Sequence, residues 1–199
     1  HLSIRRQRQM CIRDRFNKSE LAKLTSWIRS GGKVIAIGGA NSIFANKKGF
    51  GLKSKSSEDD SEDKPDKEIE LINYEDLERE RISGSITGAI FKTKIDNSHP
   101  LGFGYSDAYY TLKQGAKSYD YLEDGYNVVR LENDTAYSGF TGSKAVKDLS
   151  KSLIFGEENI GRGSVVYMID NPLFRAFWEN GKLFFANAVF YTNPSMKKL

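Results

Sequence analysis

The sequence predicts an α/β domain built as a layered open sheet with helices on both faces. Two short apolar runs, 34–37 and 165–169, are typical of strands that are buried on both sides. Apolar residues at helical spacing lie next to these runs, and a stretch rich in β-branched residues separates them. Such alternation favours packed layers around one core, and 199 residues are enough for one such domain.

The first helix is predicted within FNKSELAKLTSWIRSGG, residues 16–32. Asn17 and Glu20 fit a capping box, in which each side chain bonds a free backbone N–H of the first turn. An apolar stripe follows at helical spacing, made of Leu21, Leu24 and Ile28. Gly31 and Gly32 are expected to end the helix.

A charged segment follows the first buried strand. The strand 34–37 leads into the turn Gly38-Gly39, and residues 40–45 are expected to start another helix. Residues 53–68, KSKSSEDDSEDKPDKE, hold no apolar side chain and predict a solvated loop or disordered insert. Carboxylates cluster there, but the alternating ligands and central glycine of an EF-hand are absent.

The middle of the chain predicts a series of short strands from residue 69 onward. They fall in SITGAIFKTKID (85–96), AYYTLK (108–113) and YNVVRL (126–131), while HPLGFGY (99–105) predicts a bent or edge strand. The segment GSKAVKDLSKSLIFGEENIG (142–161) is expected to open as a helix and to end in a glycine-bounded loop.

The last third predicts a strand followed by two helices. After the strand 165–169, Asp170 or Asn171 can cap a helix that has Pro172 in its first turn. Gly181 is expected to end that helix. A final, mostly apolar helix is predicted over 182–191.

Residues 1–15 explain the whole net charge of +4. They hold five arginines, Asp14 and the only cysteine, Cys11, and the remaining chain has equal numbers of basic and acidic side chains. RRQRQMCIRDR (5–15) back-translates into the end of a transposase-type sequencing adapter, so we interpret residues 1–15 as an artefact. The alternatives are an arginine-rich arm or a transit-like peptide, although the segment has no amphipathic face.

This interpretation has two consequences, and one further expectation is independent of it. No disulfide, thiol nucleophile or cysteine-ligated metal is expected, and no nucleic-acid partner. The domain is expected to be truncated at its N-terminus, with upstream sequence missing. No run of eighteen apolar residues occurs, so no membrane span is expected.

Few residues of the remaining chain suggest chemistry. His99 is the one histidine outside the artefact, and a His-Pro turn is favoured over a triad with Ser98, since neighbours in a strand point to opposite faces. One histidine without cysteine predicts no zinc site.

The glycine turns IGGANS and GRGSVV lack the spacing of a phosphate-binding loop. Arg175, among aromatic residues, is expected to pair with a buried carboxylate or stack on a ring rather than hold a ligand anion.

Three stretches resemble a known family. RISGSITGAIFKTKIDNSHPLGFGY and GRGSVVYMIDNPLFRAFWENGKLFFANAVFY look like the C-terminal region of Bacteroidetes-type zinc metallocarboxypeptidases. LTSWIRSGGKVIAIGGA resembles their class I glutamine-amidotransferase-like domain. The resemblance implies a flavodoxin-like or amidotransferase-like sheet over residues 16–196, and a peptidase domain upstream that holds the zinc. It also implies a periplasmic or extracellular location.

The resemblance implies a non-catalytic accessory domain, for which no catalytic, cofactor-binding or metal residue is assigned. The family's cysteine nucleophile is absent from the turn Gly38-Gly39-Ala40-Asn41-Ser42. The expected partners are the upstream peptidase domain and the peptide substrate of the whole protein. The alternative is a stand-alone serine-type hydrolase or amidase-like domain that uses Ser42 or Ser98 with His99.

Overall fold

The computed structural model describes residues 17–55, 73–133 and 135–192. Residues 1–15, most of the predicted loop 53–68 and the end of the predicted domain at 193–196 lie outside the described residues. The elements in chain order are α2 (Lys18–Arg29), β1 (Lys33–Ile37), η1 (Gly38–Ile43), α3 (Tyr74–Ser83), β2 (Ile86–Ile95), η2 (Pro100–Gly102), β3 (Ala108–Lys113), β4 (Gly125–Arg130), β5 (Tyr137–Thr141), α4 (Ser143–Leu149), β6 (Leu153–Ile160), β7 (Gly163–Met168), η3 (Phe174–Ala176) and α5 (Glu179–Phe190).

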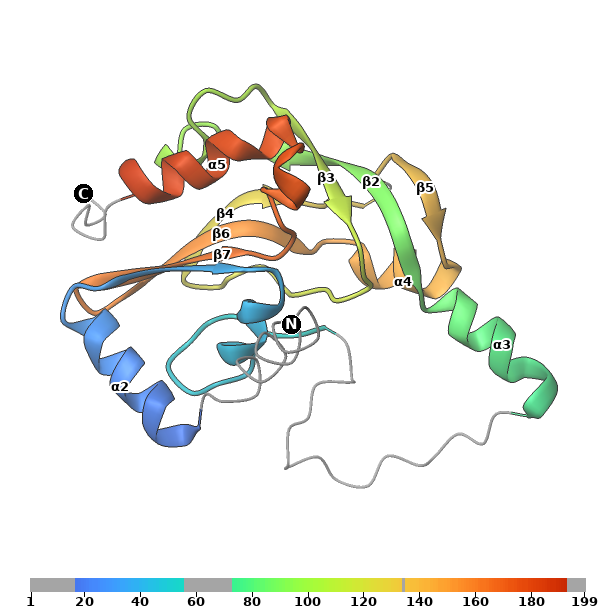
Figure 1. Ribbon diagram of the computed structural model, residues 1–199, viewed down its shortest axis with the longest axis horizontal. Helices are drawn as coiled ribbons and strands as arrows, with labels where there is room; N and C mark the ends of the chain where they lie inside the picture. The colour runs from blue at the N-terminus through green and yellow to red at the C-terminus, as the bar shows by residue number, and fades with distance from the viewer. Residues whose placement is uncertain (1–16, 56–72, 134, 193–199) are drawn as a thin grey trace, which may run out of the picture.

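One mixed sheet of seven strands forms the centre of the molecule (Figure 1). Six strands follow the order β1-β7-β6-β4-β2-β3, and β5 also pairs with β2. β1 and β7 are parallel, and the other pairs are antiparallel. The predicted α/β class is confirmed.

Helices cover both faces of this sheet because β7 is apolar on both sides. Val166 and Met168 belong to the same core cluster as Phe184 of α5. The alternating neighbours Val165 and Tyr167 belong to a second cluster with Ile28 of α2. Side chains alternate across a strand, so β7 contributes to two layers at once.

The start of the chain follows the sequence prediction closely. Asn17 Oδ1 accepts from the backbone N–H of Glu20, and Glu20 Oε2 accepts from that of Asn17, which confirms the capping box. β1 is less buried than predicted: of its residues only Ala36 is fully buried. The reason is that β1 pairs only with β7, so its other edge has no strand partner in the described part of the chain. β7 is buried throughout, as predicted.

Three predicted elements in the second half are wrong. The loop predicted up to residue 161 contains β6, a buried strand between β4 and β7. HPLGFGY forms the 3₁₀ turn η2 instead of a bent strand. The α-helix predicted to begin directly after Asn171 is absent from the described residues; the 3₁₀ turn η3 lies there, and the next α-helix, α5, begins at Glu179. Gly181 lies inside α5, where a Cβ would come within 2.2 Å of the Pro172 carbonyl oxygen, so it permits close packing and does not end a helix.

Two elements were not predicted. α3 has no buried residue, and its charged sequence shows little apolar periodicity. It projects from the sheet beside α4 (Figure 1). β5 is short and largely exposed, so its sequence lacks the pattern of a core strand.

The start of the predicted charged loop is anchored, because Ser54 forms an isolated antiparallel bridge with Tyr119.

Candidate functional site

The glycine turn after β1 carries the first predicted nucleophile, Ser42. Gly38 opens the turn with a φ of 57°, which favours glycine. Ser42 Oγ donates a hydrogen bond to the carbonyl oxygen of Gly39 at 2.7 Å. The amide of buried Asn41 donates to the carbonyl oxygens of Gly38 and Met168, both at 2.8 Å. These bonds fix the turn against the end of β7.

His99 is held in a His-Pro turn at the start of η2, as the sequence predicts. Its Nδ1 accepts a hydrogen bond from the backbone N–H of Leu101 at 3.2 Å, so the neutral ring carries its proton on Nε2. Nε2 lies 3.6 Å from Oε2 of Glu157, longer than a hydrogen bond. The ring also packs on Tyr126, with centroids 4.7 Å apart.

Ser98 is near His99 in space, but its hydroxyl is bonded elsewhere. Ser98 Oγ donates to Oδ1 of Asp96 at 2.5 Å, and the backbone N–H of Ser98 donates to the same oxygen. Ser98 and His99 were predicted to lie in a strand, with their side chains on opposite faces. That prediction was wrong, because the two residues lie in a turn between β2 and η2.

A cavity of about 240 Å³ opens beside this turn. Its walls come from the turn after β2, from β4 and β6, and from the end of α5. They consist of Asp96, Ser98, His99, Pro100, Tyr126, Glu157, Asn159 and Thr192. Ionisable side chains that converge in a concave site with shifted pKa values mark a candidate functional site.

Burial dominates the electrostatics of this cavity. It lowers the pKa of His99, although the Asp96 carboxylate opposes the shift. It raises the pKa of Glu157, which is 4% exposed, and the Ser164 hydroxyl and then the Lys33 ammonium oppose that shift. Both shifts favour the neutral forms of the two side chains. The hydrogen bond from Ser98 lowers the pKa of Asp96, which therefore remains ionised.

Glu157 is the residue of this site that the sequence did not reveal. It lies in β6, between Gly156 and Glu158, in a segment predicted as a loop. Its Oε1 is buried and has no partner within hydrogen-bond geometry among the described residues, although the nearby Ser164 hydroxyl lowers the pKa of Glu157. A buried carboxylate oxygen with an open bonding position can accept a hydrogen bond from a ligand.

Lys33 connects the site to the end of α5. Its ammonium donates to the carbonyl oxygens of Ala188, Val189 and Thr192 at 2.7–2.9 Å. A cation is favourable at this end of a helix because the last carbonyl groups have no partner within the helix. Burial lowers the pKa of Lys33, while Glu157 opposes the shift.

Asp170 has a different role from the predicted helix cap. Its Oδ1 lies 3.1 Å from Nζ of Lys113, and its Oδ2 accepts from Thr111 Oγ1 at 2.7 Å. The pair joins the segment after β7 to β3. Among the described residues, the only bond of the kind expected for the predicted cap is made by Asn171. Its Oδ1 accepts from the backbone N–H of Leu173.

Arg175 is exposed and lies in η3, with a φ of 48°. Its guanidinium carbon lies 5.2 Å from the centre of the Phe174 ring. The side chain therefore stacks on an aromatic ring, which is one of the roles predicted for it. In the described part of the chain it forms no ion pair with a carboxylate.

The described residues contain neither a metal-binding cluster nor a membrane-spanning helix. No group of three or more histidine, cysteine, aspartate or glutamate side chains is arranged to hold a metal ion. None of the helices in residues 17–55, 73–133 and 135–192 combines the length and apolar character needed to cross a bilayer.

Comparisons with known proteins give little further guidance. No protein-family model matches the chain, and no curated protein does. A solved ThuA-like protein from Bacteroides uniformis is similar over 91% of this chain and 69% of that chain, with 12% identity and a TM-score of 0.42. A likeness this distant carries no argument about function. The zinc carboxypeptidase resemblance therefore depends on the sequence stretches alone.

Proposed function

We propose that the chain is a non-catalytic accessory domain of the amidotransferase-like type, attached to a zinc carboxypeptidase. The observation that carries this proposal is the bonding of the turn after β1. A serine nucleophile needs a base that takes its proton. Here the Ser42 hydroxyl donates a hydrogen bond to the carbonyl oxygen of Gly39, and Asn41 ties the same turn to β7. The turn is organised as a structural support.

The activity of the whole protein would be metal-dependent hydrolysis of peptide C-termini. Zinc would be held by the upstream peptidase domain, since the family's ligands match no positions of this sequence. The partners would be that domain and its peptide substrate, in a periplasmic or extracellular location. The family resemblance is the support for each of these points.

A serine-type hydrolase is the second candidate, because Asp96, Ser98 and His99 line one cavity. Their bonds do not form a catalytic relay. The Ser98 hydroxyl donates to Asp96, and the His99 Nδ1 that could accept a proton is bonded to the backbone of Leu101. Catalysis would require both bonds to break, so we rank this function second.

The first experiment is to determine the genomic DNA upstream of Phe16. The proposal expects a continuous reading frame that encodes a His-x-x-Glu motif and a later histidine. A stop codon or an unrelated domain in that position would refute the peptidase assignment.

The second experiment separates the two candidates. Ester and amide turnover is measured for the chain and for the single variants Ser42→Ala, Ser98→Ala and His99→Ala. The accessory role expects turnover no higher than in buffer for all four proteins. Turnover that is lost in His99→Ala and in one serine variant, but retained in the other, would establish the hydrolase instead.

A further inference from the structure

A second, larger cavity lies where the sheet divides. One part of β2, residues 86–91, pairs with β5, and another part, residues 94 and 95, pairs with β4. The chain that connects β4 to β5 therefore leaves the sheet between these two parts. α4 covers this division, and the cavity between them has a volume of about 620 Å³. Ligand pockets commonly have this size.

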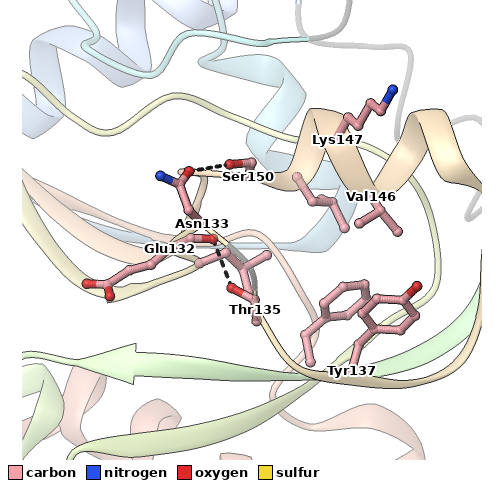
Figure 2. Close-up of a pocket in the computed structure, with 10 residues that line it drawn as sticks. Glu132, Asn133, Thr135, Tyr137, Val146, Lys147 and Ser150 are labelled. Carbon is pink, nitrogen blue, oxygen red and sulfur yellow. Dashed lines mark hydrogen bonds between the residues drawn. The ribbon is translucent and has the colours of Figure 1, made fainter.

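Part of the lining of this cavity is apolar and aromatic. Phe91 and Leu131 come from the sheet side, and Val146 and Leu149 come from α4. The ring of Phe91 stacks on that of Tyr137, with centroids 5.2 Å apart and planes 28° apart. Figure 2 shows Val146 above and Tyr137 below the space between them. An aromatic wall opposite an aliphatic wall suits a flat ring.

The charged and hydroxyl groups at the rim are not directed at the cavity. In Figure 2 the ammonium of Lys147 and the carboxylate of Glu132 point away from the space between Val146 and Tyr137. Thr135 Oγ1 donates to the backbone oxygen of Glu132 at 2.9 Å, and Ser150 Oγ donates to Asn133 Oδ1 at 2.7 Å. An uncharged ligand therefore fits better than an ionic one.

The backbone of Tyr137 supplies polar groups that have no partner among the described residues. The N–H of Lys92 donates to the carbonyl oxygen of Ala136, and bonded pairs alternate along an antiparallel ladder. Tyr137 and Phe91, which lie opposite each other, therefore form a pair without backbone hydrogen bonds. The backbone N–H and C=O of Tyr137 point away from β2. Within the described residues no group bonds to either of them. An extended residue presents these two groups side by side.

We propose that this cavity binds a small, uncharged, planar heteroaromatic molecule that carries an adjacent N–H donor and C=O acceptor, as a cyclic amide does. The ring lies between Tyr137 and Val146, and its amide edge bonds to the backbone N–H and C=O of Tyr137. This site is separate from the cavity at His99 and does not depend on the accessory role.

The test uses two probes and the full chain. Calorimetric titration is expected to detect binding of 2-quinolone, whose edge carries both groups. 1-Methyl-2-quinolone has the same rings without the donor and is expected to bind about tenfold more weakly, the effect of one lost hydrogen bond. Equal affinities for the two probes, or no binding of 2-quinolone, would overturn the proposal.

Matched variants locate the site. Tyr137→Ala and Tyr137→Pro both remove the ring, but only proline removes the N–H, and proline is tolerated at the first residue of an edge strand. We expect 2-quinolone to bind the proline variant about tenfold more weakly than the alanine variant. Val146→Trp should fill the cavity and abolish binding, whereas Val189→Trp on α5 should not change it. Retained binding in Val146→Trp would also overturn the proposal.

Discussion

Replacing Lys113 with methionine tests the buried ion pair that joins β3 to the segment after β7. Lys113 is 1% exposed and Asp170 is 9% exposed, and their charged atoms lie 3.1 Å apart. Lys113→Met keeps most of the side-chain length but leaves the Asp170 carboxylate buried, with Thr111 as its remaining donor among the described residues. Removing one partner of a buried pair costs about 3–5 kcal/mol, because the other charge remains without compensation.

The expected loss is large enough for simple assays. In a domain of this size 1 kcal/mol corresponds to about 2–4 °C, so the melting temperature should fall by about 6–20 °C. Urea unfolding followed by circular dichroism measures the same loss as a free energy.

The double variant Lys113→Met with Asp170→Met is the control. It removes both charges, and an apolar replacement of a buried pair is often neutral, so most of the stability should return. A loss below about 1 kcal/mol in Lys113→Met, or no recovery in the double variant, would show that the pair is not buried as the structure has it.

Three further predictions concern other parts of the chain. Phe184→Ala should cost about 3–5 kcal/mol in urea unfolding, because this fully buried ring packs against Tyr105 and Tyr109; a loss below 1 kcal/mol would contradict that packing. Burial raises the pKa of Glu157 in the folded state, so the free energy of unfolding should fall as the pH rises from the ordinary glutamate range through that raised pKa. Glu157→Gln should lessen this decline. A pH profile of stability that is the same in both proteins would contradict the prediction. A chain that starts at Phe16 should lose any salt-sensitive DNA binding shown by the full chain, as measured by fluorescence anisotropy, and binding that persists would refute the artefact interpretation.

The sequence predicted the elements whose signals are local. The capping box at Asn17 and the glycines at 31 and 32 place α2 within a residue or two of its observed bounds. β7 and β3 match their apolar or β-branched patterns. Each of these signals arises from bonds or burial within one short segment, so no knowledge of the partner segments was needed.

The failures occurred where distant residues decide the structure. β6 contains Gly156 and two glutamates, which are typical of a loop, yet its position between β4 and β7 buries it. Glu158 is stabilised there because both carboxylate oxygens accept from the backbone N–H of Gly51 and one accepts from the Tyr167 hydroxyl. Gly181 was predicted to end a helix, but it lies inside one, where it permits close packing on Pro172.

The same difference explains why the site at His99 was only half predicted. His99 was visible as a single histidine, but Glu157 approaches it from β6, and Lys33 of β1 acts electrostatically on Glu157. Their bonds also bear on function. His99 Nδ1 holds the backbone of η2, and Lys33 holds the last carbonyl groups of α5. A base that must release a structural bond before each proton transfer would be inefficient, because the bond must be restored in every cycle. These groups therefore act as structural supports of the cavity walls.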